Sequence, residues 1–452
     1  MENDSLASLD ILRDVHRMAS FFTKQLLTPE RESVEAIQAT IFRVPDNIRR
    51  TNADSFEPKM VSLGPYHHGK QRFRATDERI KLPNATNFFK RGIRMDEDLV
   101  ERTVERFKEW EPHLRCVYSE QINMTSNEFV AMMMLDCTFI AEFLREQAAG
   151  WYGTQKKEYL WKWAAPSIVN DMLVAENQFP LGPLLYLFDQ CTDDSLHHPP
   201  LMEFLCHDLM LQIHRNLSSP STSTSNVSSF KANSHLLHLF HGWLVSQLPR
   251  KEKHLDTVDL PSFPSAEVLE AMRIQFTNKT DGSSFLDITF DESKRSMEIP
   301  QLIINDDNIS LLRNLITFEQ QCDEVDNYIS EYVWFMDCLI NTDKDVAVLR
   351  KHKIIVSRMR NDEEVAHIFN ELRRTDAPVV DFDHLYLAEV MNNVQSYSRN
   401  RWNRLWGLWN FSWLRQNYFR NRWVSIVVTV AVFFNLLTLV QTVYAVLSYH
   451  KQ

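Results

Sequence analysis

The chain has 452 residues, of which 44% are hydrophobic and 24% charged, so it carries enough apolar material for one large core or two packed subdomains. The formal net charge is −11, but no Asp or Glu follows Glu389, so residues 1–389 carry about −18 and the remainder +7. A body this acidic lacks the basic face that phosphate binding needs, and we expect no nucleic-acid partner.

The numbers of glycines and cysteines limit which fold classes and which cellular compartments are expected. Nine glycines are few for this length, whereas nucleotide-binding α/β folds need glycine in their tight turns, so we expect a mainly helical protein. The six cysteines include no CxxC pair and form no disulfide framework, which suits a reducing compartment. The first residues lack the apolar stretch of a signal peptide. Residues 1–40 are expected to form an N-terminal segment with weak helical character that precedes the body.

Residues 41–390 are expected to form a globular body that is mainly α with a small antiparallel β-sheet, an α+β fold. Proline and glycine divide residues 56–73 into turns around one short strand. The apolar stretch at 127–147 predicts a buried helix with Ser126 or Asn127 as its cap.

The second half of the body contains the β-rich part and the longest connections. Residues 273–304 hold short β-rich runs separated by turn chemistry at Asp281-Gly282, which predicts the antiparallel sheet. Residues 218–229 are a low-complexity loop, and residues 250–264 form a second long connection. These two loops are where partner specificity could vary at little structural cost. The pattern leaves open whether the body is one domain or two.

Two groups of histidines are candidates for a metal site. His67 and His68 are adjacent in a turn, where two neighbouring imidazoles chelate one ion poorly, so hydrogen bonding within a packed loop is favoured. His235, His238 and His241 share one helix face, which is closer to ligand geometry. No Asp, Glu or Cys of matching spacing completes either set, and we expect no metal and no cofactor.

Glu176-Asn177-Gln178 lies in an apolar context just before Pro180. A buried carboxylate there is either catalytic or structural. We favour the structural interpretation, in which Glu176 accepts hydrogen bonds from backbone freed at the proline break. The chain has no GxSxG, no P-loop and no GxGxxG after a strand, so we expect no enzyme and assign no catalytic residue.

The stretch from Trp423 to Tyr449 runs 27 residues without a charge. At about 1.5 Å per residue it could span a hydrocarbon core of about 30 Å, which predicts a single C-terminal transmembrane helix. Basic residues, among them Arg420 and Arg422, precede this stretch and only Lys451 follows it, so the positive-inside rule places the body in the cytosol. The sequence does not say which membrane is involved.

Residues 399–422 are expected to form an amphipathic helix along the membrane surface. Its tryptophans recur at helical spacing and share one face, while arginines occupy another. The tryptophans are Trp402, Trp406, Trp409 and Trp413.

Several segments together resemble the plant domain-of-unknown-function 247 family, also called UPF0481-type membrane proteins. These are IFRVPDNIRRTNADSFEPKMVSLGPYHHGK, DMLVAENQFP, and a later block that includes MEIPQLIINDDNISLLRNLITFEQ. The resemblance covers roughly residues 41–449. One departure is that Ala271-Met272-Arg273 stands here where the family usually has A-G-V. The motif residues, whose role is unknown, are Pro45, Gly64, Pro65, His67, His68, Gly69, Glu176, Asn177, Gln178 and Pro180.

The resemblance implies a plant-specific, membrane-associated protein with no established catalytic activity. Some grass members of the family are implicated in self-incompatibility, and others in stress or growth. Our leading hypothesis is a membrane-anchored, non-enzymatic module that recognises an unknown partner protein in signalling or self-recognition. The alternatives are an unrecognised enzyme with Glu176, His67 or His68 in a pocket, and a structural membrane scaffold that forms homo-oligomers.

Overall fold

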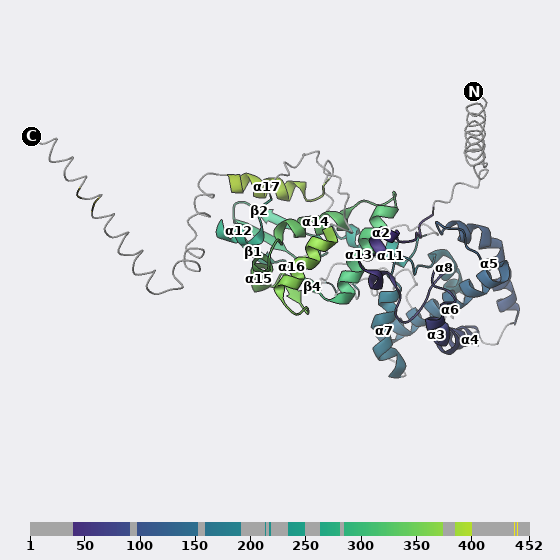
Figure 1. Cartoon of the computed structure of the whole chain (residues 1–452). Coiled ribbons are helices and arrows are strands. Elements are labelled where there is room, and N and C mark those ends of the chain that lie inside the picture. The colour runs from purple at the N-terminus through teal and green to yellow at the C-terminus, as the bar shows by residue number, and fades with distance from the viewer. Residues whose placement is uncertain are drawn as a thin grey trace, which may run out of the picture.

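The computed structural model describes residues 39–90, 97–151, 159–190, 234–248, 263–280, 284–373 and 385–399, together with Ile213, Leu217, Thr438 and Gln441. The described helices gather into two lobes (Figure 1). One lobe holds α3 to α8, the other holds α12, α14 to α17 and the strands, and α11 and α13 lie between them. Buried apolar side chains of both lobes form one continuous cluster, so the lobes share a core.

The N-terminal lobe is built from short helical turns followed by longer helices. Its elements are α2 (Asp46–Arg49), η1 (Ala53–Phe56), η2 (Gln71–Phe73), α3 (Arg74–Thr76), η3 (Asp77–Lys81), α4 (Leu82–Lys90), α5 (Glu97–Cys116), α6 (Ser126–Trp151), α7 (Tyr159–Asp171) and α8 (Leu181–Gln190). Helix α6 packs against α4, α5 and α8 and is the centre of this lobe. Thr125 caps it, since the Thr125 and Glu128 side chains exchange hydrogen bonds with each other's backbone N–H groups. The expected cap, Ser126 or Asn127, is therefore displaced by one residue or two.

The central and C-terminal elements run from residue 236 to residue 399. They are α11 (Leu236–Ser246), α12 (Ala266–Ala271), β1 (Gln275–Asn278), β2 (Thr289–Asp291), β3 (Ser296–Ile299), β4 (Leu302–Ile304), α13 (Asp306–Gln321), α14 (Tyr328–Leu339), α15 (Asp343–Lys351), β5 (Ile355–Ser357), α16 (Asp362–Glu371) and α17 (Ala388–Arg399). Helix α13 contacts η1, α11, α14 and β4, so it joins the two lobes. The Asn305 side chain caps this helix by accepting the Asn308 N–H at 2.8 Å.

The sheets are small, as expected, but they are not purely antiparallel. In the three-stranded sheet β1-β3-β2, β2 pairs antiparallel with β3 while β1 pairs parallel with it. A second, two-stranded sheet pairs β4 with β5 in parallel. A tight turn through Arg295, at φ 55°, makes the β2–β3 hairpin. Strand β2 comes between β1 and β3 in the chain, and helices α13 to α15 come between β4 and β5. Only a short hairpin connection requires antiparallel pairing, so both of these pairs can be parallel.

The expected C-terminal transmembrane helix is not supported. Within the residues that the structure describes, no helix combines the length and the apolar character needed to cross a membrane. Helices α5 and α6, with 20 and 26 residues, are long enough, but α5 is charged along its length and α6 carries Asp136 and Glu142 in its middle. The prediction of a single-pass anchor, and of a cytosolic body held beside the bilayer by it, is therefore corrected.

Other predictions fall outside the described residues. Of the segment from Trp423 to Tyr449, only Thr438 and Gln441 are described. The tryptophan-bearing helix expected at 399–422 lies outside as well, apart from Arg399 at the end of α17. The same holds for residues 1–38 and for the low-complexity loop at 218–229.

Candidate functional site

The two motif segments of the N-terminal half, near residue 64 and near residue 177, are locked together. The Asn177 side chain accepts the Leu63 N–H at 2.6 Å and donates to the Val61 carbonyl at 3.0 Å. The Gly64 N–H donates to Asp136 of α6 at 2.8 Å. Buried backbone groups need such partners, so these side chains fix the turn segment against the helices of the lobe.

Glu176 is fully buried and is the centre of this network. Its Oε1 atom accepts the Val44 N–H at 2.6 Å and forms an ion pair with Arg49. Its Oε2 atom lies 3.6 Å from both the Arg43 guanidinium and Nε2 of His67. Glu176 thus joins the segment at residues 43–49 to the His67 turn, 109 positions before it in the chain.

His67 is fully buried and neutral. Lys70 Nζ lies 2.8 Å from His67 Nδ1, and because an ammonium can only donate, Nδ1 is the acceptor and the proton is on Nε2. Burial first, and then the positive charge of Lys70, lower the pKa of His67 to about 3. The structure therefore brings His67 and Glu176 together but encloses both, whereas His68 is exposed.

The backbone at the proline break is satisfied by the neighbours of Glu176. The Asn177 side chain donates to the Asp171 carbonyl at 2.9 Å. The Gln178 side chain donates to the carbonyls of Met172 and Val174 at 2.8 and 2.7 Å. Asp171 is the last residue of α7 and the other two carbonyls follow it, where helical partners are missing. Glu176 does not accept backbone N–H groups freed at the break, as we predicted; it accepts the distant Val44 N–H, while Asn177 and Gln178 donate to the carbonyls that precede the break.

The remaining motif residues shape the backbone. Gly64 and Gly69 have φ of 65° and 75°, in the left-handed region that glycine adopts without strain. Pro45 precedes the first residue of α2, and the Pro65 carbonyl accepts the His68 N–H. Pro180 is buried just before α8. These positions fix turns and helix starts.

The three histidines at 235, 238 and 241 pack around one aromatic ring. All three imidazoles contact Phe318 of α13, with ring centroids 5.2 to 5.7 Å apart. His241 pairs with Glu319 at 2.8 Å, and His235 lies 3.0 Å from the Thr40 carbonyl. Within the described ranges, no group of three or more His, Cys, Asp or Glu side chains could hold a metal ion.

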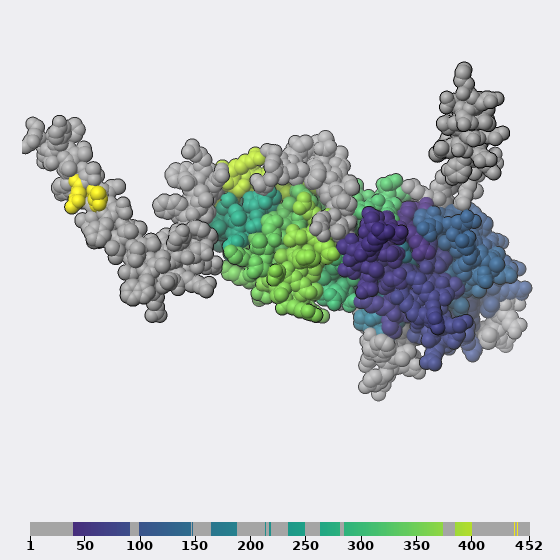
Figure 2. Space-filling view, in the orientation of Figure 1, coloured from purple at the N-terminus to yellow at the C-terminus, as the bar shows by residue number. Residues whose placement is uncertain are grey.

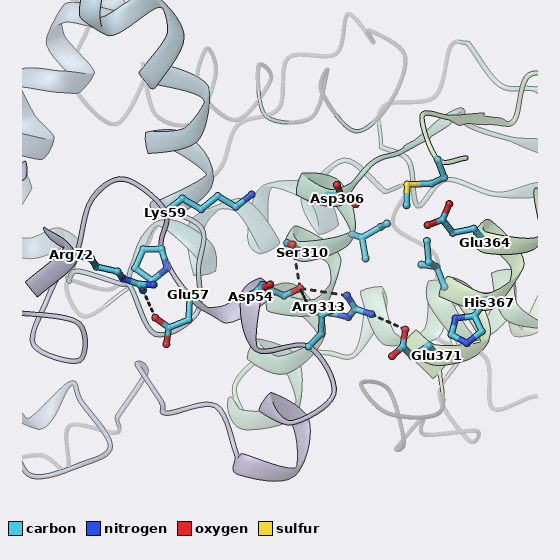
Figure 3. Close-up of a pocket in the computed structure, with 16 residues that line it drawn as sticks. Asp54, Glu57, Lys59, Arg72, Asp306, Ser310, Arg313, Glu364, His367 and Glu371 are labelled. Carbon is cyan, nitrogen blue, oxygen red and sulfur yellow. Dashed lines mark hydrogen bonds and ion pairs between the residues drawn. The ribbon is translucent and has the colours of Figure 1, made fainter. Parts of the chain in front are cut away.

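A cleft of about 620 Å³ lies where the lobes meet, and we call it the interlobe cleft (Figure 3). One wall is formed by residues 52–59 with Arg72, and the other by the start of α13, Met359 and α16. Figure 2 shows the purple surface of the early residues meeting the green surface of the later ones near the middle of the molecule. The volume is within the range of roughly 300–1,000 Å³ found for ligand sites.

Charged side chains dominate the lining of this cleft. They are Asp54, Glu57, Lys59, Arg72, Asp306, Arg313, Glu364 and Glu371, with His367 beside them. The three cations are engaged: Arg72 pairs with Glu57, Lys59 with Asp307 at 2.8 Å, and Arg313 with Glu371 at 3.3 Å. Arg313 also donates to the Ser55 hydroxyl at 3.4 Å, so it connects the two walls.

Three carboxylates of the cleft have no such counter-charge. Among the described residues, no cation lies within ion-pair distance of Asp54, Asp306 or Glu364. Asp306 and Glu364 lie in the first turns of α13 and α16, where the helix dipole stabilises negative charge. The hydrogen bond to Asp307 raises the pKa of Lys59 against the effect of burial, and the charges of Asp307, Asp171 and Asp306 raise it further. The cleft is therefore electrostatically negative around Lys59.

The inner end of the cleft continues toward Asp171, which accepts the N–H groups of Lys59, Met60 and Val61 at 2.5 to 2.8 Å. Burial raises the pKa of Asp171 to about 6 in spite of these three donors. Our sequence interpretation identified none of the cleft residues. One signal was present, because Arg313 interrupts an apolar helical run and therefore had to be buried with a partner.

The fold is that of a two-lobed, mainly helical α+β protein with a polar cleft between its lobes. More particularly, the model of the plant protein family of unknown function DUF247 matches residues 41–437, and the chain belongs to this family. The chain is 26% identical to UPF0481 protein At3g47200 of Arabidopsis thaliana over 439 residues, which cover 92% of this chain and 88% of the relative. It is 21% identical to Putative UPF0481 protein At3g02645 of the same plant over 472 residues, covering 82% and 84%. No solved structure matches the chain significantly.

Proposed function

We propose that this protein is a non-enzymatic recognition module that binds a segment of a partner protein in the interlobe cleft. The observation that carries the proposal is the cleft itself, about 620 Å³ in volume and lined by both lobes. A site at the junction of two packed units is a common place for ligand binding. The process it serves, signalling or self-recognition, depends on the identity of the partner.

The character of the lining supports binding over chemistry. Its cations are held in ion pairs, and Ile309 and Ile368 add buried aliphatic surface to the lining. The strongest acid–base pair of the motif segments, Glu176 with His67, is fully buried and does not line the cleft. A substrate would have to displace the Arg49 ion pair to reach Glu176.

A cleft-blocking variant tests this function. Ser310 lines the cleft and is half-buried, so Ser310→Phe should fill the space, whereas Ser293→Phe places the same side chain in the exposed β2–β3 turn. Random short peptides selected on the wild-type protein are then measured against both variants by fluorescence anisotropy. We expect selected peptides that bind wild type and Ser293→Phe but lose binding to Ser310→Phe. If no selected peptide distinguishes the two variants, the proposed function is wrong.

A further inference from the structure

The charge balance of the interlobe cleft specifies the chemistry of its ligand. The lining carries five carboxylates and three cations, an excess of two negative charges with His367 neutral. Because the cations are already paired, a ligand meets Asp54, Asp306 and Glu364, which have no cationic partner among the described residues. One oxygen of Glu364 accepts the Arg360 N–H at 3.0 Å, which leaves its other oxygen for a ligand. A ligand cation would gain attraction there without separating an existing pair, whereas a ligand anion would be repelled.

The cleft also offers apolar contact beside these carboxylates. Ile309 lies three residues after Asp306 on α13, and Ile368 lies four residues after Glu364 on α16, so in each helix the aliphatic and acidic side chains share a face. Both isoleucines are buried members of the lining, and Pro58 and Met359 line the cleft with them. In Figure 3, Asp306 and Glu364 lie on the α13 and α16 side of the cleft, across from Arg72 and Glu57.

We infer that the partner segment carries a Lys or Arg next to an aliphatic residue, with the basic group among Asp54, Asp306 and Glu364 and the aliphatic group against Ile309 and Ile368. This inference rests on the proposed function and specifies its partner. The basic group makes charge-assisted hydrogen bonds to the carboxylates, and the aliphatic group removes apolar surface from water. An acidic or uncharged segment meets neither condition.

The test uses the full chain and three matched pools of short synthetic peptides. All peptides carry a Leu, Ile or Val, and the pools differ at the position beside it. This position is Lys or Arg in the basic pool, Gln in the second pool and Glu in the third. The test variant is Asp306→Asn with Glu364→Gln, which keeps side-chain shape and removes two charges. Its matched control is Asp343→Asn with Glu363→Gln, which removes exposed acids in the first turns of α15 and α16 that do not line the cleft.

We expect the basic pool to bind wild type and the control alike, and to bind the test variant roughly tenfold more weakly or worse. Raising the salt concentration should reduce this difference, because screening weakens the attraction. The inference is wrong if the Gln or Glu pool binds in the cleft as tightly as the basic pool does. That result would leave the proposed function standing. Equal binding of the basic pool to the test and control variants also overturns the inference. If no pool shows binding that Ser310→Phe abolishes, the inference and the proposed function both fall.

Discussion

The backbone N–H of Val44 donates to the carboxylate of Glu176 at 2.6 Å, across 132 positions of the chain. The same carboxylate pairs with Arg49, so one fully buried acid fixes both ends of the segment that begins the folded body. Buried carboxylates are costly unless paired and hydrogen-bonded, and Glu176 meets both conditions. The motif around Glu176 therefore contributes to the assembly of the fold.

Glu176→Gln should lower the free energy of unfolding by about 3 kcal/mol, because it leaves Arg49 without its buried partner. The matched control is Glu120→Gln, which breaks the exposed pair with Arg43 and should cost less than about 1 kcal/mol. Urea denaturation of both variants at neutral pH measures the difference. Equal losses would show that burial of Glu176 adds nothing to its ion pair.

His67 should make stability depend on pH. Its folded pKa of about 3 is depressed below the unfolded value of 6.5, so the folded state binds fewer protons between these limits. Its contribution is present above about pH 6.5 and is lost, at about 1.4 kcal/mol per pH unit, as the pH falls toward 3. His67→Gln removes this contribution.

Unfolding free energies of wild type and His67→Gln, measured at about pH 7 and pH 4, test the linkage. The advantage of wild type should shrink by about 3 kcal/mol on acidification. Asp171, whose pKa is raised to about 6, acts in the opposite direction, but it is present in both proteins and cancels in the comparison. A pH-independent difference between the two proteins would contradict a buried, neutral His67.

Gly64 and Gly69 form a matched pair for a backbone test. A Cβ at Gly64 would lie 2.7 Å from the Gln178 carbonyl oxygen and 2.9 Å from the Tyr118 hydroxyl, whereas a Cβ at Gly69 meets nothing within 4 Å. Both have positive φ, so each Ala variant bears the left-handed strain of about 1–2 kcal/mol. Gly64→Ala should therefore cost clearly more than Gly69→Ala.

Thermal unfolding of the two alanine variants measures this difference. We expect Gly69→Ala to lower the free energy of unfolding by about 1 kcal/mol, and Gly64→Ala by about 3 kcal/mol or more. The extra loss comes from a clash with backbone, which cannot move away as a flexible side chain could. Similar losses would mean that the two motif segments are not in close contact at Gly64.

Local patterns identified the helices and the buried motif residues, but not their partners. Polar residues within apolar runs, such as Glu176 and Gln178, had to be buried and hydrogen-bonded, and this was predictable. Which groups they bind was not, because Val44, which donates to Glu176, and Leu237, which donates to Gln178, come from segments that only the folded chain brings near. The same limit affected the sheet, whose parallel pairs depend on the path between strands and not on the strands' own residues.

The interlobe cleft was missed for a different reason. Asp306 and Glu364 follow the caps Asn305 and Asn361, and acids in a first helical turn are explained by the dipole alone. Only the packing of α13 and α16 against residues 52–59 brings them into one lining. The C-terminal transmembrane helix was predicted from the apolar composition of its segment alone, with no knowledge of tertiary packing.

Asn314 of α13 is the residue whose change should most directly loosen the cleft. Its Oδ1 atom accepts the Ala175 N–H at 2.8 Å, and its Nδ2 atom donates to the carbonyls of Ser55 and Ser310 at 2.8 and 2.7 Å. Asn314→Asp keeps the shape but turns an oxygen toward two carbonyls, which should cost about 3 kcal/mol. Asn370→Asp is the control, because Asn370 is exposed and its side chain donates to the Ala366 carbonyl one turn earlier in the same helix.

Hydrogen exchange locates the effect. In Asn314→Asp, the amides of residues 53–61 should exchange faster than in wild type, because the Ser55 carbonyl loses its tie to α13 and the wall of the cleft opens more often. Exchange in α4 and α6 of the N-terminal lobe should change only as far as global stability falls. Asn370→Asp should leave the 53–61 segment as protected as in wild type. Uniformly faster exchange in every element would instead mean that Asn314 acts on the whole fold and has no particular role at the cleft.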